Sequence, residues 1–193
     1  MRRVILLALL ALALPVLATA DSIDVSNHFG TITGGDGGLT LSGSVIFGYG
    51  SIVGANLGTV SFTTGAFTMG SAAAGGTLAG GGTFTITGNG SVMGVPNGVI
   101  FTGTFAPGAT WTLHSGSGGN TYILAGTIEG TGASATTSQV TMSIAAGKGF
   151  AGSIPFGSGD TIISTTVPEP GTLGLLGTGL LAVGGLVRRK LKS

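Results

Sequence analysis

The sequence contains no cysteine, which excludes disulfide bonds and thiol catalysis. Charge is also scarce, at 7% of all residues. Between positions 21 and 167 the only basic residue is Lys148, so the net charge of this region is 1 − 5 = −4. Its acidic residues are Asp21, Asp24, Asp36, Glu129 and Asp160. Because nucleic acid is bound through clustered Lys and Arg, we predict no nucleic-acid partner.

Groups for acid–base catalysis are too few and too scattered to predict an active site. A glycosidase needs two carboxylates that face one cleft, and Glu129 and Asp160 are the only pair in strand-like sequence that could serve. We interpret both as solvated strand or turn residues. The sequence therefore predicts no catalytic residue.

Metal ligands are equally sparse. His28 and His114 are the only imidazoles, and neither has a closely spaced partner of the H-x-x-x-H kind. His114 alternates with threonines, which predicts a solvent-facing strand position. Asp36 precedes two glycines in a turn that lacks the other oxygen ligands of a calcium loop. We predict neither a metal nor a cofactor.

Glycine is abundant, with 40 residues in the chain, and threonine and serine fill much of the remainder. Such a composition is found both in disordered segments and in turn-rich β domains. Disordered segments have few aromatic or β-branched residues, whereas nine Phe, two Tyr and one Trp occur here. A single folded β domain over residues 21–166 is therefore favoured.

Alternation of polar and apolar residues supports this interpretation, because period two is typical of half-buried strands. It is clearest in Thr83–Thr87, and Val140, Met142 and Ile144 share one face of another strand. Further strands are expected at 22–25, 39–47, 59–63, 101–105, 110–114, 122–129, 150–155 and 161–165. A turn is expected at Ala72–Ala74.

Turn signals lie between these segments. Asn89-Gly90 and Asn97-Gly98 are suited to type I′ hairpins, and Pro107-Gly108 separates two further strands. About ten short strands joined in this way predict an all-β fold with one antiparallel β-sandwich or jelly-roll-like domain. A parallel β-helix is the alternative, although the spacing of hydroxyl–glycine steps shows no fixed repeat.

Aromatic side chains on β-sandwiches can bind carbohydrate, because their flat faces offer apolar area at low entropic cost. Trp111, Tyr49 and Tyr122 are the candidates for such a surface. Trp111 shares a strand face with Leu113, which favours burial in the core instead.

The first 20 residues have the three parts of a secretory signal peptide. Arg2 and Arg3 form the basic region, and Val4–Leu17 forms an apolar region of 14 residues, fewer than the roughly 20 that span a bilayer. The small residues Ala18 and Ala20 then mark a signal-peptidase cleavage site. We expect cleavage before Asp21, which predicts export.

The C-terminus has a second apolar segment, Gly171–Val187, which is uncharged and contains six glycines. As a transmembrane helix it would reach roughly 25 Å, a little less than the hydrocarbon core. Pro168, Glu169 and Pro170 precede it and resist helix formation. The basic residues that follow it are Arg188, Arg189, Lys190 and Lys192. These cations predict a stop-transfer end that stays in the cytoplasm.

This order of Pro-Glu-Pro, a Gly/Leu-rich span and Arg-Arg-Lys resembles the PEP-CTERM sorting domain of exosortase substrates. The resemblance covers residues 167–193 and no others. It implies recognition by a membrane-embedded, transpeptidase-like exosortase, a transient stay in the inner membrane, and loss of the tail. It also implies delivery to the cell surface or into exopolysaccharide. The alternative is an uncleaved C-terminal anchor, which the same hydropathy would support.

Taken together, these observations predict an exported surface or matrix protein with a structural or adhesive role and no enzymatic activity. Signal peptidase and an exosortase are its expected processing partners. A carbohydrate-binding module is the alternative, and a polysaccharide-acting enzyme is the less favoured one.

Overall fold

The computed structural model describes residues 22–165, and all of their regular structure is β-strand. The twelve strands follow one another along the chain. They are β1 (Ser22–His28), β2 (Thr31–Gly35), β3 (Gly38–Tyr49), β4 (Ile52–Thr63), β5 (Phe67–Ser71), β6 (Gly75–Leu78), β7 (Gly81–Asn89), β8 (Asn97–Phe105), β9 (Thr110–Gly116), β10 (Gly119–Gly130), β11 (Ala133–Thr141) and β12 (Ser153–Thr165).

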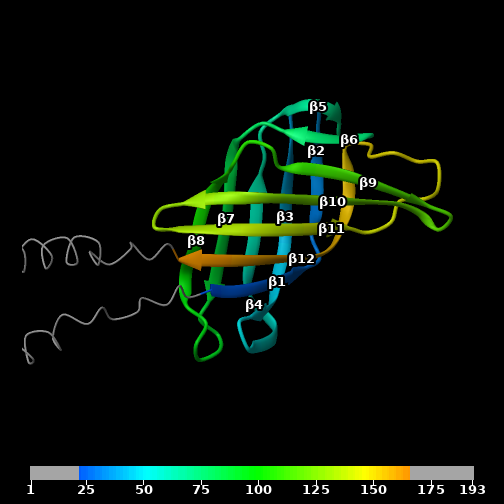
Figure 1. The fold of residues 1–193 in the computed structure, drawn as a ribbon. Helices are drawn as coiled ribbons and strands as arrows, with labels where there is room; N and C mark the ends of the chain where they lie inside the picture. The colour runs from blue at the N-terminus through cyan, green and yellow to red at the C-terminus, as the bar shows by residue number, and fades with distance from the viewer. Residues whose placement is uncertain (1–21, 166–193) are drawn as a thin grey trace, which may run out of the picture. The chain divides into compact units, whose positions relative to one another are not determined.

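The strands form two layers that cross at a steep angle (Figure 1). In the view of Figure 1, β9, β10, β11, β12 and β1 run across the front, and β2, β3, β4, β7 and β8 stand behind them. Hydrogen-bonded pairing links the layers at both sides, through β8–β10 on one side and through β1–β3 and β2–β12 on the other. Strand pairing therefore runs from the front layer into the layer behind it at one side, and back into the front layer at the other.

The prediction of an all-β, antiparallel domain is confirmed, because every strand pair is antiparallel. The same pairings exclude the parallel β-helix for the described residues. The sandwich or jelly-roll arrangement is not confirmed, because the two layers belong to one twelve-stranded sheet.

Alternation places the core between the layers. In β7, Phe84 and Ile86 are buried while the threonines beside them lie on the outer side. The rings of Phe62, Phe84 and Phe105 meet in this core at centroid distances of 5.7–6.0 Å. Aromatic pairs at such distances add to the free energy of burial.

Three short strands, β2, β5 and β6, escaped sequence analysis because glycine weakens their pattern. The expected turn at Ala72–Ala74 joins β5 to β6. The expected strands at 150–155 and 161–165 are parts of one strand, β12, which begins at Ser153.

The two Asn-Gly hairpins were predicted wrongly. Asn89 ends β7 and Asn97 begins β8, and these two residues pair across the mouth of one longer loop. The Asn89 side chain accepts the N–H of Ser91 at 3.0 Å and donates to the carbonyl of Asn56 at 2.8 Å. Its carboxamide thus closes an Asx turn that starts a wider loop.

Candidate functional site

The residues expected to direct processing lie outside the described residues. These are the cleavage-site residues Ala18, Ala20 and Asp21, the motif Pro168, Glu169 and Pro170, and the basic cluster Arg188, Arg189, Lys190 and Lys192. The transmembrane helix expected at 171–187 also lies there. The structure nevertheless places the two points at which the domain meets these segments.

Both points lie at the same end of neighbouring, paired strands. Strand β1 begins at Ser22, which pairs with Ser164 near the end of β12. Thr165, the last residue of β12, pairs with Ala133 of β11. Only two residues, Thr166 and Val167, separate β12 from Pro168. The two expected processing sites, which are far apart in sequence, therefore lie next in sequence to neighbouring strands.

Glu129 and Asp160 are both exposed and do not form a catalytic pair. Their strands are separated by β11, where Glu129 lies opposite Ser134 and Asp160 lies opposite Ser138. Two strand spacings and four residues along the strand put the carboxylates roughly 16 Å apart. Glycosidases need about 5 to 9.5 Å, so these two residues cannot act on one glycosidic bond.

The histidines and Asp36 do not gather into a metal site either. Among residues 22–165 no group of three His, Cys, Asp or Glu side chains is placed to hold a metal ion. His114 is exposed on β9, as its alternation predicts. Asp36 accepts the N–H of Ala72 at 2.9 Å, so its carboxylate ties the β2–β3 turn to the β5–β6 turn.

Two of the three aromatic residues considered for carbohydrate binding are in the core. Trp111 and Tyr122 are fully buried and stack at 4.9 Å, with Phe150 edge-on to both rings. The Trp111 indole donates to the carbonyl of Ala72 at 2.8 Å. Tyr49 is half-buried and packs against the core. The burial of Trp111 that its face with Leu113 predicts is confirmed.

A cluster of buried polar side chains, which sequence analysis missed, occupies the interior between β1, β3, β11 and β12. Asn27 donates to Ser44 Oγ at 2.7 Å and to Gln139 Oε1 at 3.0 Å. Gln139 donates to Thr137 Oγ1 at 2.9 Å, and Thr137 lies 3.0 Å from Thr161 Oγ1. We call these five residues the amide–hydroxyl cluster. Its members hydrogen-bond to one another. A closed network of this kind fixes the packing of the interior and leaves no group free for a ligand.

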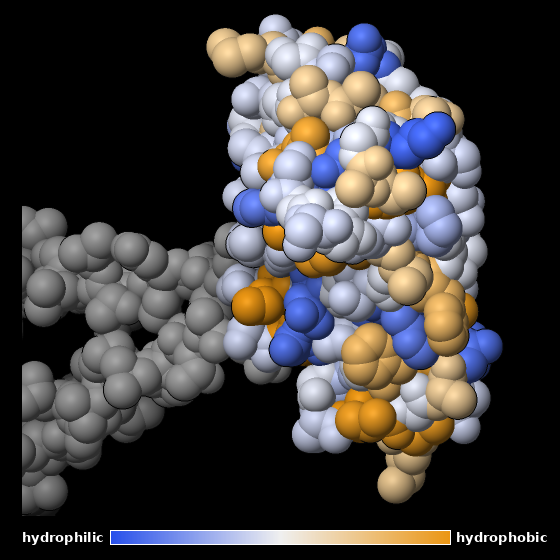
Figure 2. Space-filling model, turned by 90° about the vertical axis from the view of Figure 1, so that its right-hand side faces the viewer, coloured by the Kyte–Doolittle hydropathy of each residue, from blue (hydrophilic) through white to orange (hydrophobic). Residues whose placement is uncertain are grey.

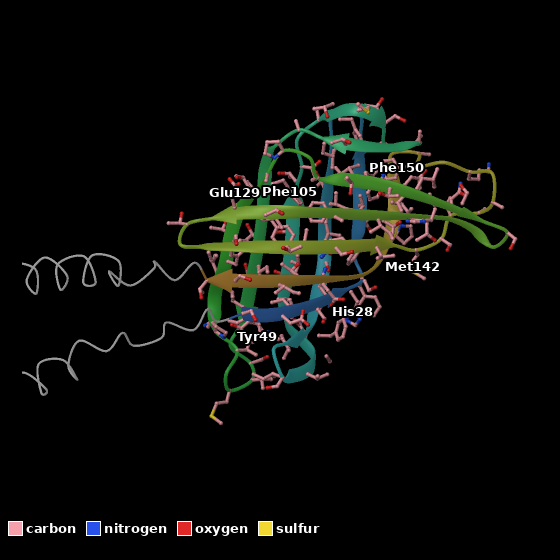
Figure 3. The ribbon with its side chains drawn as sticks, in the orientation of Figure 1. His28, Tyr49, Phe105, Glu129, Met142 and Phe150 are labelled. Carbon is pink, nitrogen blue, oxygen red and sulfur yellow. The ribbon has the colours of Figure 1, made fainter. Side chains whose placement is uncertain are left out.

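This cluster lies on the inner face of β11, most of which the expected strand at 140–144 missed. Thr137, Gln139 and Thr141 point inward, while Met142 is exposed where the chain leaves the sheet (Figure 3). No local signal could have revealed this, because Asn27 and Gln139 are 112 residues apart in sequence.

Comparison with known families bears on the tail alone. Residues 166–190 match the family model of the PEP-CTERM protein-sorting motif, which confirms the resemblance drawn from the sequence. Neither the curated proteins nor the solved structures contain a match. Within the part of the chain that the structure describes, no helix is long and apolar enough to cross a membrane.

Proposed function

We propose that this chain, which carries a PEP-CTERM protein-sorting motif, is a structural or adhesive protein of the cell surface or of the extracellular, exopolysaccharide-containing matrix. The motif at residues 166–190 implies export and exosortase-dependent sorting at the membrane. The domain of residues 22–165 is the part that would remain after processing.

The main support for the proposal is where the sorting motif begins relative to the last strand of the domain. It begins at residue 166, directly after Thr165 ends β12. At about 3.3–3.6 Å per residue, the three steps from Thr165 to Pro168 span roughly 10 Å at most. Strand β12 is held by β1 and β11 on its two sides. Removal of the tail beyond Pro168 would therefore leave every strand of the sheet in place.

The pairing of Ser22 with Ser164 supports the same proposal. It brings the beginning of the exported domain beside its end, so an N-terminal and a C-terminal membrane segment would both leave from one edge. A protein in transit could then be held at one membrane through both ends without distortion of the sheet.

A non-enzymatic role is supported by the separation of Glu129 from Asp160. A polysaccharide-acting enzyme would still need an acid, and Glu129 is the residue to test. If hydrolysis of a polysaccharide panel is found and is lost in Glu129→Gln, the role proposed here is wrong.

The sorting step is tested by replacing Pro168-Glu169-Pro170 with Ala-Ala-Ala in the full chain. If an exosortase reads the tripeptide, an unprocessed form should accumulate in the inner membrane. Intact-mass measurement of the wild-type exported form should show a chain from Asp21 to near Pro168–Pro170. Surface delivery of the triple-alanine variant at the wild-type level would contradict the proposal and favour a simple anchor.

The contrasting variant neutralises Arg188, Arg189, Lys190 and Lys192. Without these cations the glycine-rich span loses its stop-transfer signal, so we expect the full-length protein to be exported without being sorted. The two variants should thus fail in different places, one held in the inner membrane and one exported past it without being sorted.

A further inference from the structure

The layer formed by β2, β3, β4, β7 and β8, which we call the rear layer, carries rows of hydroxyl groups on its outer face. Its centre is formed by Thr59, Ser61 and Thr63 on β4, which pair with Thr87, Thr85 and Thr83 on β7. All six are exposed or half-buried. Threonines and serines on the outer side of β2, β3 and β8 continue the rows. We call this surface the hydroxyl face.

The hydroxyl face has no charge. No charged residue occurs in β2, β3, β4, β7 or β8. Of the four exposed acids, Asp24, Glu129 and Asp160 lie on the front layer, on β1, β10 and β12, and Asp36 lies in the turn between β2 and β3. The strands of one layer thus carry three of the exposed acids, whereas the strands of the other are uncharged and offer hydrogen-bond donors and acceptors.

At the corner between β1 and β2 an exposed phenylalanine, Phe29, follows His28, which is separated from Thr59 of this face by Val45 of β3. Phe29 is 64% exposed, and its φ of 60° makes it the only non-glycine residue with positive φ among those described. Its ring lies 3.9 Å from that of His28, which in turn lies 4.8 Å from the ring of Phe47. His28 Nε2 is buried without a hydrogen-bond partner.

Two features that are unfavourable for folding are therefore found in neighbouring residues. A bulky residue in the left-handed region and an unpartnered buried nitrogen each lower the stability of the fold, and folded proteins retain such costs mainly at functional sites. The conformation of Phe29 does not serve the packing of the core, because most of its ring is exposed.

The strand register makes the corner and the hydroxyl face continuous. His28 lies opposite Val45, Val45 opposite Thr59, and Thr59 opposite Thr87. Figure 2 looks at the side of the domain toward which β1 runs before it turns into β2. Hydrophilic, weakly polar and apolar patches alternate over that side.

We propose that Phe29 and the hydroxyl face together bind an uncharged polysaccharide chain. The Phe29 ring offers a flat apolar platform for the C–H face of a sugar ring. Each threonine or serine hydroxyl provides one donor and two acceptor positions, which match the hydroxyls of a neutral glycan. Rows about 4.8 Å apart across the strands repeat this contact, so weak single contacts add up along one polymer.

The same observations disfavour other occupants. An anionic polymer would meet an uncharged surface on a domain whose described residues carry a net charge of 1 − 4 = −3. A second protein copy would need an apolar centre to its interface, and the centre here is threonine and serine. Register shifts between Leu41 and Ser44 and between Gly81 and Phe84 interrupt the rows, which suits a flexible chain better than a crystalline surface.

This inference deepens the matrix role proposed above, and it is tested separately from sorting. The processed protein, purified from cells, is run by affinity electrophoresis through gels that contain a neutral β-glucan, a neutral galactomannan or an anionic polyuronate. We expect retardation by at least one neutral polymer and none by the polyuronate. Loss of sorting in the tail variants would leave this result unchanged.

The variant Phe29→Asn tests the platform, because asparagine tolerates positive φ and should leave the fold at least as stable. Its dissociation constant for the neutral polymer should rise roughly tenfold or more. The pair Ser61→Val and Thr85→Val removes two central hydroxyls while keeping strand-forming residues, and should weaken binding several-fold.

The matched control is Thr136→Val with Ser138→Val on the outer side of β11, where binding should stay within about twofold of wild type. The inference is overturned if no neutral polymer retards the protein or if Phe29→Asn binds normally. It is also overturned if the polyuronate is preferred, or if sedimentation shows a dimer that the Ser61→Val and Thr85→Val pair abolishes.

Discussion

Gly159 of β12 is expected to be indispensable because Gln139 of β11 lies directly over it. The two residues are opposite one another in the antiparallel ladder. A Cβ atom built on Gly159 would overlap the carboxamide of Gln139 and meet no other group as closely. The carboxamide is itself held by hydrogen bonds to Asn27 and Thr137 in the amide–hydroxyl cluster. Gly159→Ala should therefore force Gln139 out of the cluster.

The expected cost follows from three contributions. Overpacking of a filled interior costs about 1–3 kcal/mol, and a buried amide that loses its partner costs about 1–3 kcal/mol more. The φ of Gly159 lies outside the left-handed region, so alanine offsets about 0.4–1 kcal/mol through the unfolded state. Together these contributions span about 1–5.5 kcal/mol, and we expect Gly159→Ala to lower the free energy of unfolding by about 3 kcal/mol, near the middle of that range.

A second substitution separates the steric effect from a general intolerance of β12. Gln139→Ala alone should also cost about 2–4 kcal/mol, because it leaves a void and unpartnered groups on Asn27 and Thr137. Once Gln139 is absent, however, the Cβ at position 159 has space. The double variant should therefore cost less than the sum of the single ones, by about 1–3 kcal/mol.

Urea unfolding measures these free energies, with the fluorescence of Trp111 as the signal. Trp111 is the only tryptophan and is fully buried, so its emission reports on the whole core. Gly35→Ala is the control, because nothing lies within 4 Å of a Cβ at that position. Additive costs in the double variant, or a Gly159→Ala protein as stable as wild type, would refute the reasoning.

Two further substitutions test other parts of the fold by thermal and urea unfolding. Tyr122→Phe removes a hydroxyl that donates to the carbonyl of Ala73 and accepts the N–H of Phe150 at 2.9 Å, so we expect a loss of about 2–3 kcal/mol. An unchanged midpoint would contradict the assignment of these two hydrogen bonds. Gly58→Ala should cost more than about 2 kcal/mol, because φ is 151° and the added Cβ would overlap a backbone carbonyl of β7. Gly37→Ala, which meets no atom within 4 Å, should stay within about 0.5 kcal/mol of wild type, and equal costs at the two glycines would refute the steric argument.

Local sequence was sufficient for four of the longer strands but not for all of them. Only 59–63 of β4 and the last two residues of β11 were expected, and β12 was expected as two strands. Alternation in β7, β8, β9 and β10 predicted their positions, because each of these strands has one face in the core and one in solvent. It also predicted the burial of Trp111 and the exposure of His114. The tail motif could also be identified from the sequence alone, because a sorting signal is recognised as a linear segment.

Local sequence failed where partners are remote. The interior position of Gln139 depends on Asn27, which is 112 residues away in sequence. The loop between Asn89 and Asn97 depends on a hydrogen bond from Asn89 to Asn56 on another strand. In both cases a tertiary hydrogen bond overrides the local pattern, because a buried or turn-closing polar group adopts the position in which it is satisfied.

The sequence by itself indicated export and sorting through the tail, and it indicated that residues 22–165 form a domain of β-strands. Period two and linear motifs are local properties, and they persist whatever the rest of the chain does. Only the tertiary structure decided that both layers belong to one sheet, that Ser22 lies beside Ser164, and that the hydroxyl rows align into one uncharged face next to Phe29. Those features depend on strand order and register, which follow from the packing of residues far apart in sequence.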